Sequence, residues 1–252
     1  MSLFIVYGFL FICEEQDNVR ARLINCKTIM NVMNSKPKLT IDTLIKEAKE
    51  FCITFSQIRH PRIVGVTDGK AIGTYIEQLF ENFLEQKYTV TIGSSAEGID
   101  LPDPDINTDI KATFIKQPQS SCPFKNARQK IFGLGYNLLL FVYQKDDNMQ
   151  NNLQFLHARF IDKNRTADYQ TTKGLREYIQ RGGNIDDIKA FLMDRNLPVD
   201  EIELDKIAKE ILENPPQIGY LTISNALQWR LLYSHVINLE EEVKGVIKIY
   251  DR

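Results

Sequence analysis

The sequence predicts an α/β protein with a central mixed β-sheet flanked by helices, and three patterns support this fold class. Residues 70–86 place apolar side chains on one helical face. Residues 137–143 are almost continuously apolar, as in a central strand that is covered on both faces. Between them, residues 107–115 have the character of a strand whose side chains alternate between two faces.

The composition is that of an ordinary globular protein. The formal net charge is −2, so a nucleic-acid-binding protein of this sequence must gather its Lys and Arg side chains on one surface. The cysteines have no metal-ligand spacing and predict free thiols in a reducing cytoplasm: Cys13, Cys26, Cys52 and Cys122. No zinc site is expected, because the three histidines are widely separated in the sequence.

We expect an N-terminal extension, an α/β core and a helical elaboration with a closing strand packed on the core, in residues 1–39, 40–163 and 164–252 respectively. The extension begins with an apolar stretch, residues 1–13, which is shorter than the roughly 20 residues needed to cross a bilayer. No membrane partner is therefore expected. This stretch is either a buried strand or helix, or it precedes a start at Met30 or Met33.

Apolar periodicity predicts a helix from Thr40, a helix over 70–86, strands over 88–92 and 107–115, a helix from Pro123 to Leu134, and strands over 137–143 and 153–161. Pro102 and Pro104 predict a tight connection between two antiparallel strands. The rest of the chain predicts two or three helices within 172–214, a helix over 222–237 and a last strand over 246–250.

The residues best suited to chemistry lie between Gly98 and Lys111. Asp100 lies upstream of Asp109, and strand alternation directs Asp109 and Lys111 to the same side. Two carboxylates and an ammonium that converge on one point form a poor structural core and a good site for metal-assisted hydrolysis. Mg²⁺ is the expected cofactor, because it binds through one or two carboxylates and retains several waters.

Such a site suits phosphodiester cleavage, which needs an activated water and positive charge against the phosphorane. Asp100 and Asp109 are the expected metal ligands, and the carbonyl of Ile110 is a third. Lys111 would orient or help deprotonate the water and would stabilise developing charge. Asp103 is the alternative first ligand, since the choice of Asp100 depends on the length of the hairpin before Asp109.

The helix over 70–86 adds a row of carboxylates four residues apart, Glu77, Glu81 and Glu85. Glu77 borders the apolar stripe and can reach a site at the sheet edge. We expect Glu81 and Glu85 to lie on a solvated face.

Several segments resemble the PD-(D/E)xK nuclease superfamily, and specifically type II restriction endonucleases: Gly73-Thr74-Tyr75-Ile76-Glu77, Gly98-Ile99-Asp100, Asp109-Ile110-Lys111 and Gln129. The resemblance covers residues 63–143 and implies a restriction-endonuclease-like core. It also implies Mg²⁺-dependent cleavage of double-stranded DNA at a short site by a homodimer, with 5′-phosphate ends and Glu77 as an accessory acid. In the family the first acidic residue often follows proline, which here precedes Asp103 and Asp105 rather than Asp100.

DNA contacts are expected directly after the catalytic strand. The polar loop after this strand offers amide and hydroxyl groups that can read base edges, from Lys116, Gln117, Gln119 and Ser120. The following helix places Lys125 and Arg128 near phosphates, with Gln129 beside them.

Two other functions would use the same residues. One is a repair or recombination nuclease with this core, and the other is a DNA-binding protein in which the acidic loop only makes a turn. The intact set of Asp100, Asp109 and Lys111 favours the site-specific endonuclease, because a non-catalytic protein has no physical need for it. Such an enzyme endangers its own genome, so a cognate DNA methyltransferase is expected as its genomic neighbour.

Overall fold

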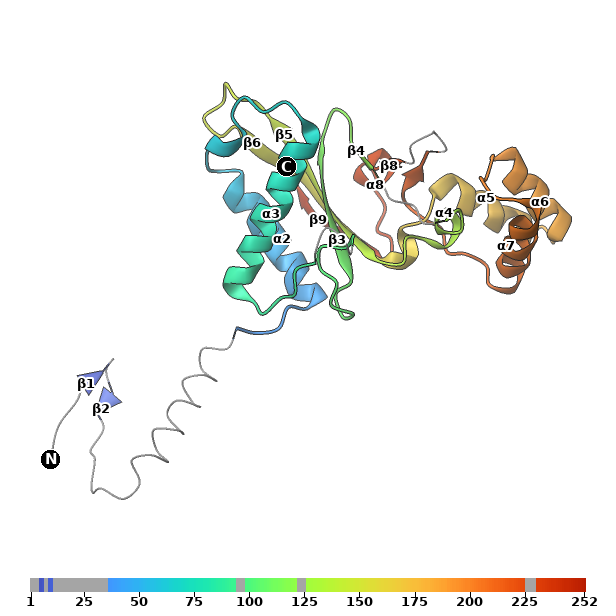
Figure 1. Cartoon of the computed structure of the whole chain (residues 1–252), viewed down its shortest axis with the longest axis horizontal. Coiled ribbons are helices and arrows are strands. Elements are labelled where there is room, and N and C mark those ends of the chain that lie inside the picture. The colour runs from blue at the N-terminus through green and yellow to red at the C-terminus, as the bar shows by residue number, and fades with distance from the viewer. Residues whose placement is uncertain (1–4, 7–8, 11–35, 94–97, 122–125, 225–229) are drawn as a thin grey trace, which may run out of the picture. The chain divides into compact units, whose positions relative to one another are not determined.

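The computed structural model describes residues 36–93, 98–121, 126–224 and 230–252, together with two short strands near the N-terminus (Figure 1). The chain divides into two compact units, residues 1–37 and 38–252. In the first unit, β1 (Ile5–Val6) and β2 (Phe9–Leu10) pair in antiparallel orientation. The rest of the apolar stretch 1–13 lies outside the described residues.

A four-stranded mixed sheet forms the centre of the second unit, in the order β3-β5-β6-β9. Its strands are β3 (Thr108–Phe114), β5 (Asn137–Lys145), β6 (Leu153–Ile161) and β9 (Val246–Asp251). β3 runs parallel to β5, whereas β6 is antiparallel to both β5 and β9. This arrangement confirms the predicted α/β class, and it leaves β3 at an edge of the sheet.

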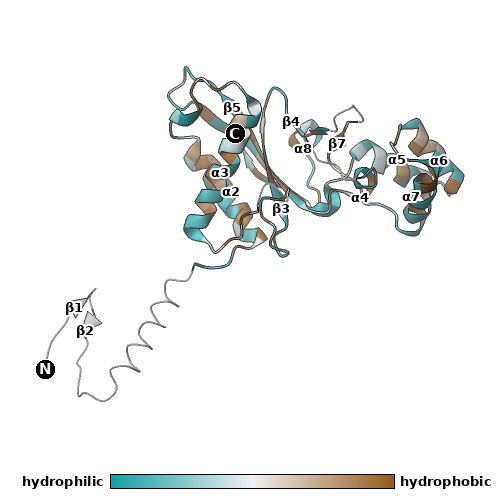
Figure 2. Ribbon diagram, in the orientation of Figure 1, coloured by the Kyte–Doolittle hydropathy of each residue, from teal (hydrophilic) through white to brown (hydrophobic). Residues whose placement is uncertain are grey.

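Two amphipathic helices, α2 (Ile41–Phe55) and α3 (Gly69–Lys87), pack on one face of this sheet (Figures 1 and 2). The ring of Phe51 on α2 lies 5.0 Å from that of Phe80 on α3 and 5.3 Å from that of Phe141 on β5, measured between centroids. Both helices were predicted from their apolar stripes, and the structure confirms them.

Capping side chains explain where these helices begin. Thr40 and Thr43 bond each other's backbone amides at the start of α2, which is a capping box. The Asp68 carboxylate accepts hydrogen bonds from the backbone amides of Lys70 and Ala71 at the start of α3. These bonds determine the residue at which α3 begins, and α3 carries Glu77.

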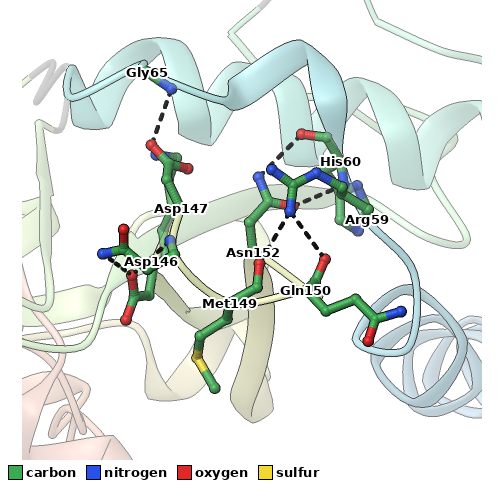
Figure 3. Close-up of polar contacts among 10 residues, drawn as sticks. Arg59, His60, Gly65, Asp146, Asp147, Met149, Gln150 and Asn152 are labelled. Atoms are coloured by element: carbon green, nitrogen blue, oxygen red, sulfur yellow. Dashed lines mark hydrogen bonds and ion pairs between the residues drawn. The ribbon is translucent and has the colours of Figure 1, made fainter.

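The segment between α2 and α3 is tied to the turn between β5 and β6 (Figure 3). The Asn152 side chain accepts a hydrogen bond from the His60 amide at 2.8 Å and donates one to the His60 carbonyl at 3.1 Å. The Asp147 carboxylate accepts a hydrogen bond from the Gly65 amide at 2.9 Å, and Arg59 donates to carbonyls of the same turn. These contacts hold the chain before α3 against the central sheet.

A smaller sheet packs on the other face of the central sheet. Part of it is formed by residues 222–237, for which a helix was predicted. In place of that helix, the structure has β7 (Thr222–Ile223), β8 (Arg230–Leu232) and α8 (Ser234–Ile237), while residues 225–229 lie outside the described residues. β8 pairs with both β7 and β4 (Gln119–Ser121). The prediction was wrong because the buried side chains alternate, as at Leu231 and Tyr233, which is the period of a strand.

The predicted helical elaboration is formed by α5 (Tyr169–Gln180), α6 (Ile185–Asp194) and α7 (Glu201–Glu213), which enclose an apolar cluster of their own. The preceding helix, predicted to reach Leu134, is much shorter among the described residues: α4 spans Gln129–Phe132. Gly133, with φ of 91°, ends it. None of the described helices combines the length and apolar character needed to span a bilayer.

The predicted antiparallel hairpin between 88–92 and 107–115 is wrong. In the first segment, Thr89 forms one isolated parallel bridge with Lys38, and β3 pairs instead with β5. Only Leu101 forms an antiparallel bridge with Thr108. The backbone pairing does not continue along β3, because the Ile110 amide donates to the Asp100 side chain.

Candidate active site

The free edge of β3 is occupied by carboxylates. Leu101 and Thr108 exchange two backbone hydrogen bonds of 3.0 Å at its start. Two residues further along β3, Asp100 Oδ2 accepts a hydrogen bond of 2.7 Å from the Ile110 amide. At the next outward position, the Ala112 amide opposes the effect of burial on the pKa of the Glu77 carboxylate, which belongs to α3. An otherwise unpaired amide of the edge strand therefore holds Asp100 in place, and Glu77 lies close to the next one.

Asp109 and Lys111 form an ion pair beside this edge. Asp109 Oδ2 lies 2.7 Å from Lys111 Nζ, and the Asp109 residue is 3% exposed. Lys111 Nζ also donates a hydrogen bond of 3.0 Å to the Ile110 carbonyl. The structure thus brings together Asp100, Asp109, Lys111, Glu77 and the Ile110 carbonyl, all of which sequence reasoning named.

Burial of these charges shifts their protonation equilibria. Burial, together with the neighbouring Asp100 carboxylate, raises the pKa of Asp109 to about 7, although Lys111 opposes the shift. Burial also raises the pKa of Glu77, helped by Asp100. Burial acts to lower the pKa of Lys111, but the carboxylates of Asp109, Asp100 and Glu77 outweigh it and the pKa is raised. The cluster carries more negative than positive groups, which favours an additional cation.

A divalent cation fits the donors at this edge. The Lys111 ammonium contacts both Asp109 Oδ2 and the Ile110 carbonyl, so these oxygens already stabilise positive charge. Within the described ranges, no three His, Cys, Asp or Glu side chains group as they would in a metal site built from three such ligands. A site with the carboxylates of Asp100 and Asp109 and a carbonyl instead suits Mg²⁺, which retains several waters.

The alternative ligand Asp103 faces elsewhere. Its carboxylate accepts a hydrogen bond of 3.0 Å from the Asp105 amide and lies 3.3 Å from Lys38 Nζ. The pKa of Asp103 is lowered by the hydrogen bond from Asp105 and by Lys38. Geometry therefore favours Asp100 as the first acidic residue of the site.

Glu81 is closer to the site than the sequence suggested. It was expected on a solvated face, but it is partly buried, one helical turn after Glu77. Burial and the charges of Asp100, Glu77 and Glu85 raise its pKa to about 7. The four-residue spacing from Glu77 was the signal for a shared face. Glu85 is exposed, as expected.

The residues predicted to read DNA follow β3 closely. Lys116 and Gln117 are exposed at the turn between β3 and β4. Gln119 and Ser120 lie in β4, where a loop was predicted, because β4 pairs with β8. The Ser120 hydroxyl lies 2.5 Å from that of Tyr233.

The residues predicted to meet phosphates have other contacts. Arg128 Nε donates a hydrogen bond of 2.9 Å to Glu210, and its guanidinium lies over the Phe132 ring. Gln129 Nε2 donates to the Leu134 carbonyl at 3.2 Å. Lys125 lies outside the described residues. Arg128 and Gln129 thus have structural contacts around α4.

Two comparisons with known proteins match most of the chain. The model of the family described as type II restriction enzyme NspV matches residues 38–248, which include all the residues from Glu77 to Lys111. Type II restriction enzyme NspV from Nostoc sp. (strain ATCC 29411 / PCC 7524) is 54% identical over 215 residues, covering 84% of this chain and 97% of the relative. No solved structure is significantly similar to the chain. The chain therefore belongs to the NspV family of type II restriction enzymes.

Proposed function

We propose that this type II restriction endonuclease hydrolyses double-stranded DNA at a short specific site with the cluster at the edge of β3. The observation that carries this proposal is the convergence of Asp100, Asp109 and Lys111 beside the Ile110 carbonyl. We further propose that the core is a member of the PD-(D/E)xK superfamily, with Asp109-Ile110-Lys111 as its (D/E)xK motif.

Asp100, Asp109 and the Ile110 carbonyl would hold Mg²⁺. Hard oxygen donors of this kind are those that Mg²⁺ takes in proteins. When bound, the ion supplies positive charge against the phosphate and activation of the attacking water. The amide of Ile110 fixes the Asp100 carboxylate, so one ligand is oriented before any ion arrives.

Lys111 acts on the water and on the reacting phosphate. Its ammonium, held 2.7 Å from Asp109, can donate to the water or to a non-bridging oxygen and stabilise the charge that develops there. The bond between water oxygen and phosphorus forms as the bond to the 3′ oxygen breaks, which leaves a 5′-phosphate and a 3′-hydroxyl. Glu77, whose negative charge helps to raise the pKa of Lys111, is an accessory acid that helps to hold the ammonium.

The turn after β3 is the proposed base-reading element. Lys116 and Gln117 are exposed there, and Gln119 and Ser120 follow in β4. We propose that these side chains contact base edges in the major groove. Arg128, a proposed phosphate contact, also joins α4 to α7 through its hydrogen bond with Glu210.

Two chains are proposed to act together. The strands of a DNA duplex run in opposite directions, and each chain brings Asp100, Asp109 and Lys111 together once, at the edge of β3. A two-fold symmetric homodimer would present one such cluster to each strand. The enzyme would act in the cytoplasm, and a cognate DNA methyltransferase encoded by a neighbouring gene would protect the same site in the host genome.

We expect the purified enzyme to cut mixed plasmid DNA into discrete fragments with Mg²⁺ and to leave it intact with EDTA. Fragment ends ligated without prior phosphorylation would establish the 5′-phosphates. Smeared products, or cleavage restricted to junctions, would instead indicate a repair or recombination nuclease. Intact DNA across several unmethylated plasmids would contradict the proposal.

Gly93→Ala should reduce cleavage without touching a charged group. Gly93 donates a hydrogen bond of 2.8 Å to the Asp100 carbonyl, and a Cβ at Gly93 would lie 2.0 Å from the Ile99 carbonyl oxygen. The added methyl must displace Asp100, and we expect a loss of about a hundredfold in the Mg²⁺-dependent rate, typical of a misplaced group. Gly69→Ala is the matched control, because a Cβ added at Gly69 would meet no neighbouring atom within 4 Å. Equal rates for both variants would contradict this role of Gly93.

A further inference from the structure

We propose that Thr113 is a positioning residue for specificity, whose hydroxyl fixes the base-reading strand β4 in register with the catalytic strand β3. This inference rests on the proposed function, in which the turn after β3 and the residues of β4 contact base edges. It concerns a residue that neither holds metal nor touches the reacting phosphate.

Thr113 shares a face of β3 with the reactive pair. The pairing of β3 with β5 is continuous from Thr108 to Phe114, so alternation puts Asp109, Lys111 and Thr113 on one side. The Thr113 residue is 3% exposed, two positions after Lys111. Because Thr113 and Lys111 belong to the same strand, a shift of Thr113 along the strand direction also shifts Lys111.

The Thr113 hydroxyl joins β3 to β4 across the connecting turn. Its oxygen accepts a hydrogen bond of 2.9 Å from the Gln119 amide. Its hydrogen can be donated to the Gln119 carbonyl at 3.1 Å or to the Gln117 carbonyl at 3.4 Å. A single buried hydroxyl thus contacts the backbone of two residues that we propose to read bases.

β4 also contacts β8 and the residue that follows it. Among the described residues, β4 pairs with β8 at Gln119, Ser120 and Ser121, and the Tyr233 amide donates to the Pro118 carbonyl at 2.9 Å. The Ser120 hydroxyl meets that of Tyr233. A slip of one residue in this pairing would exchange the faces of Gln119 and Ser120. Together with the hydrogen bond of 3.1 Å from the Gln117 amide to the Phe114 carbonyl, the Thr113 hydroxyl ties this register to Asp109 and Lys111.

The test compares variants on one duplex that contains the site cut by the wild-type enzyme and on duplexes with one base pair changed. The specificity ratio is kcat/KM on the wild-type site divided by kcat/KM on a changed duplex. Thr113→Val removes the hydroxyl at nearly constant volume. We expect it to lower this ratio about tenfold or more, an effect comparable to losing one base contact. Cleavage of the changed duplexes should continue, because Asp109 and Lys111 are retained. Thr113→Ser keeps the hydroxyl and should keep the wild-type ratio.

Thr172→Val is the matched control for loss of a buried hydroxyl. Thr172 is fully buried, and its hydroxyl bonds the Asp168 carbonyl at 2.7 Å and the Gly219 amide at 2.9 Å, neither of which belongs to β4. We expect Thr172→Val and Thr113→Val to lower the melting temperature alike, but Thr172→Val should leave the ratio of kcat/KM values unchanged. If Thr113→Val does not fold, Thr113→Ala removes the same hydroxyl without a second methyl and takes its place in the comparison.

A wild-type ratio in a folded Thr113 variant without the hydroxyl would overturn the inference. Gln117→Ala and Gln119→Ala separate this failure from failure of the proposed function. If they lower the ratio while Thr113→Val does not, base reading by this element stands and the role of Thr113 falls. If neither glutamine variant changes the ratio, the proposed reading element is wrong, and the inference falls with it.

Discussion

We expect Asp109→Asn to lower the Mg²⁺-dependent cleavage rate by about a hundredfold to a thousandfold, the effect of removing one well-placed electrostatic group. Asparagine matches the shape of aspartate, so the 3% exposed position stays filled while its negative charge is lost. Lys111 keeps its interactions with Asp100 and Glu77, and the metal-free protein should therefore unfold near the wild-type temperature. Plasmid cleavage rates and thermal unfolding measure the two effects.

The control for Asp109→Asn is Asp105→Asn, which lies in the connection directly before β3. The Asp105 side chain is 77% exposed and pairs with Lys38 at the surface, so its replacement should leave cleavage unchanged. We expect Mg²⁺ to raise the melting temperature of both the wild type and Asp105→Asn, and to leave that of Asp109→Asn unchanged. Wild-type cleavage by folded Asp109→Asn would refute its assignment as a metal ligand.

Lys111→Met should cause a second large loss, also about a hundredfold to a thousandfold in rate, because the stabilising ammonium disappears. Methionine preserves much of the side-chain length. Without the ammonium, the carboxylates of Asp109, Asp100 and Glu77 repel one another, so the metal-free variant should melt below wild type. Mg²⁺ should then stabilise Lys111→Met more than wild type, since the ion replaces the missing positive charge.

Lys206→Met controls for loss of a lysine charge, because its side chain is 70% exposed and distant in sequence from β3. It should change neither the cleavage rate nor the Mg²⁺-induced stabilisation. A Lys111→Met enzyme with the rate of Lys206→Met would show that Lys111 has no part in the reaction.

Long apolar patterns allowed much of the core to be predicted from the sequence. α2, α3, β5 and β6 each bury a regular set of side chains over nine or more residues. Their periods distinguish helix from strand without tertiary information. Asp109 and Lys111 were predicted to share one side because strand alternation depends only on local geometry.

Elements that depend on a distant partner could not be predicted in this way. β4 and β8 are three-residue strands that exist because they pair with each other, more than a hundred positions apart. The environment of Glu81 likewise depends on Asp100, which reaches it only through the packing of α3 against β3. The hydroxyl of Thr113 gave no signal in the sequence, since its partner is the backbone of β4.

The most direct test of the active site is a crystal structure of the enzyme with the duplex it cuts and Mn²⁺, whose anomalous scattering locates the ion. We expect an anomalous peak between the carboxylates of Asp100 and Asp109 and the Ile110 carbonyl, with Lys111 facing the scissile phosphate. An ion bound elsewhere, with the duplex phosphates away from the edge of β3, would contradict the account.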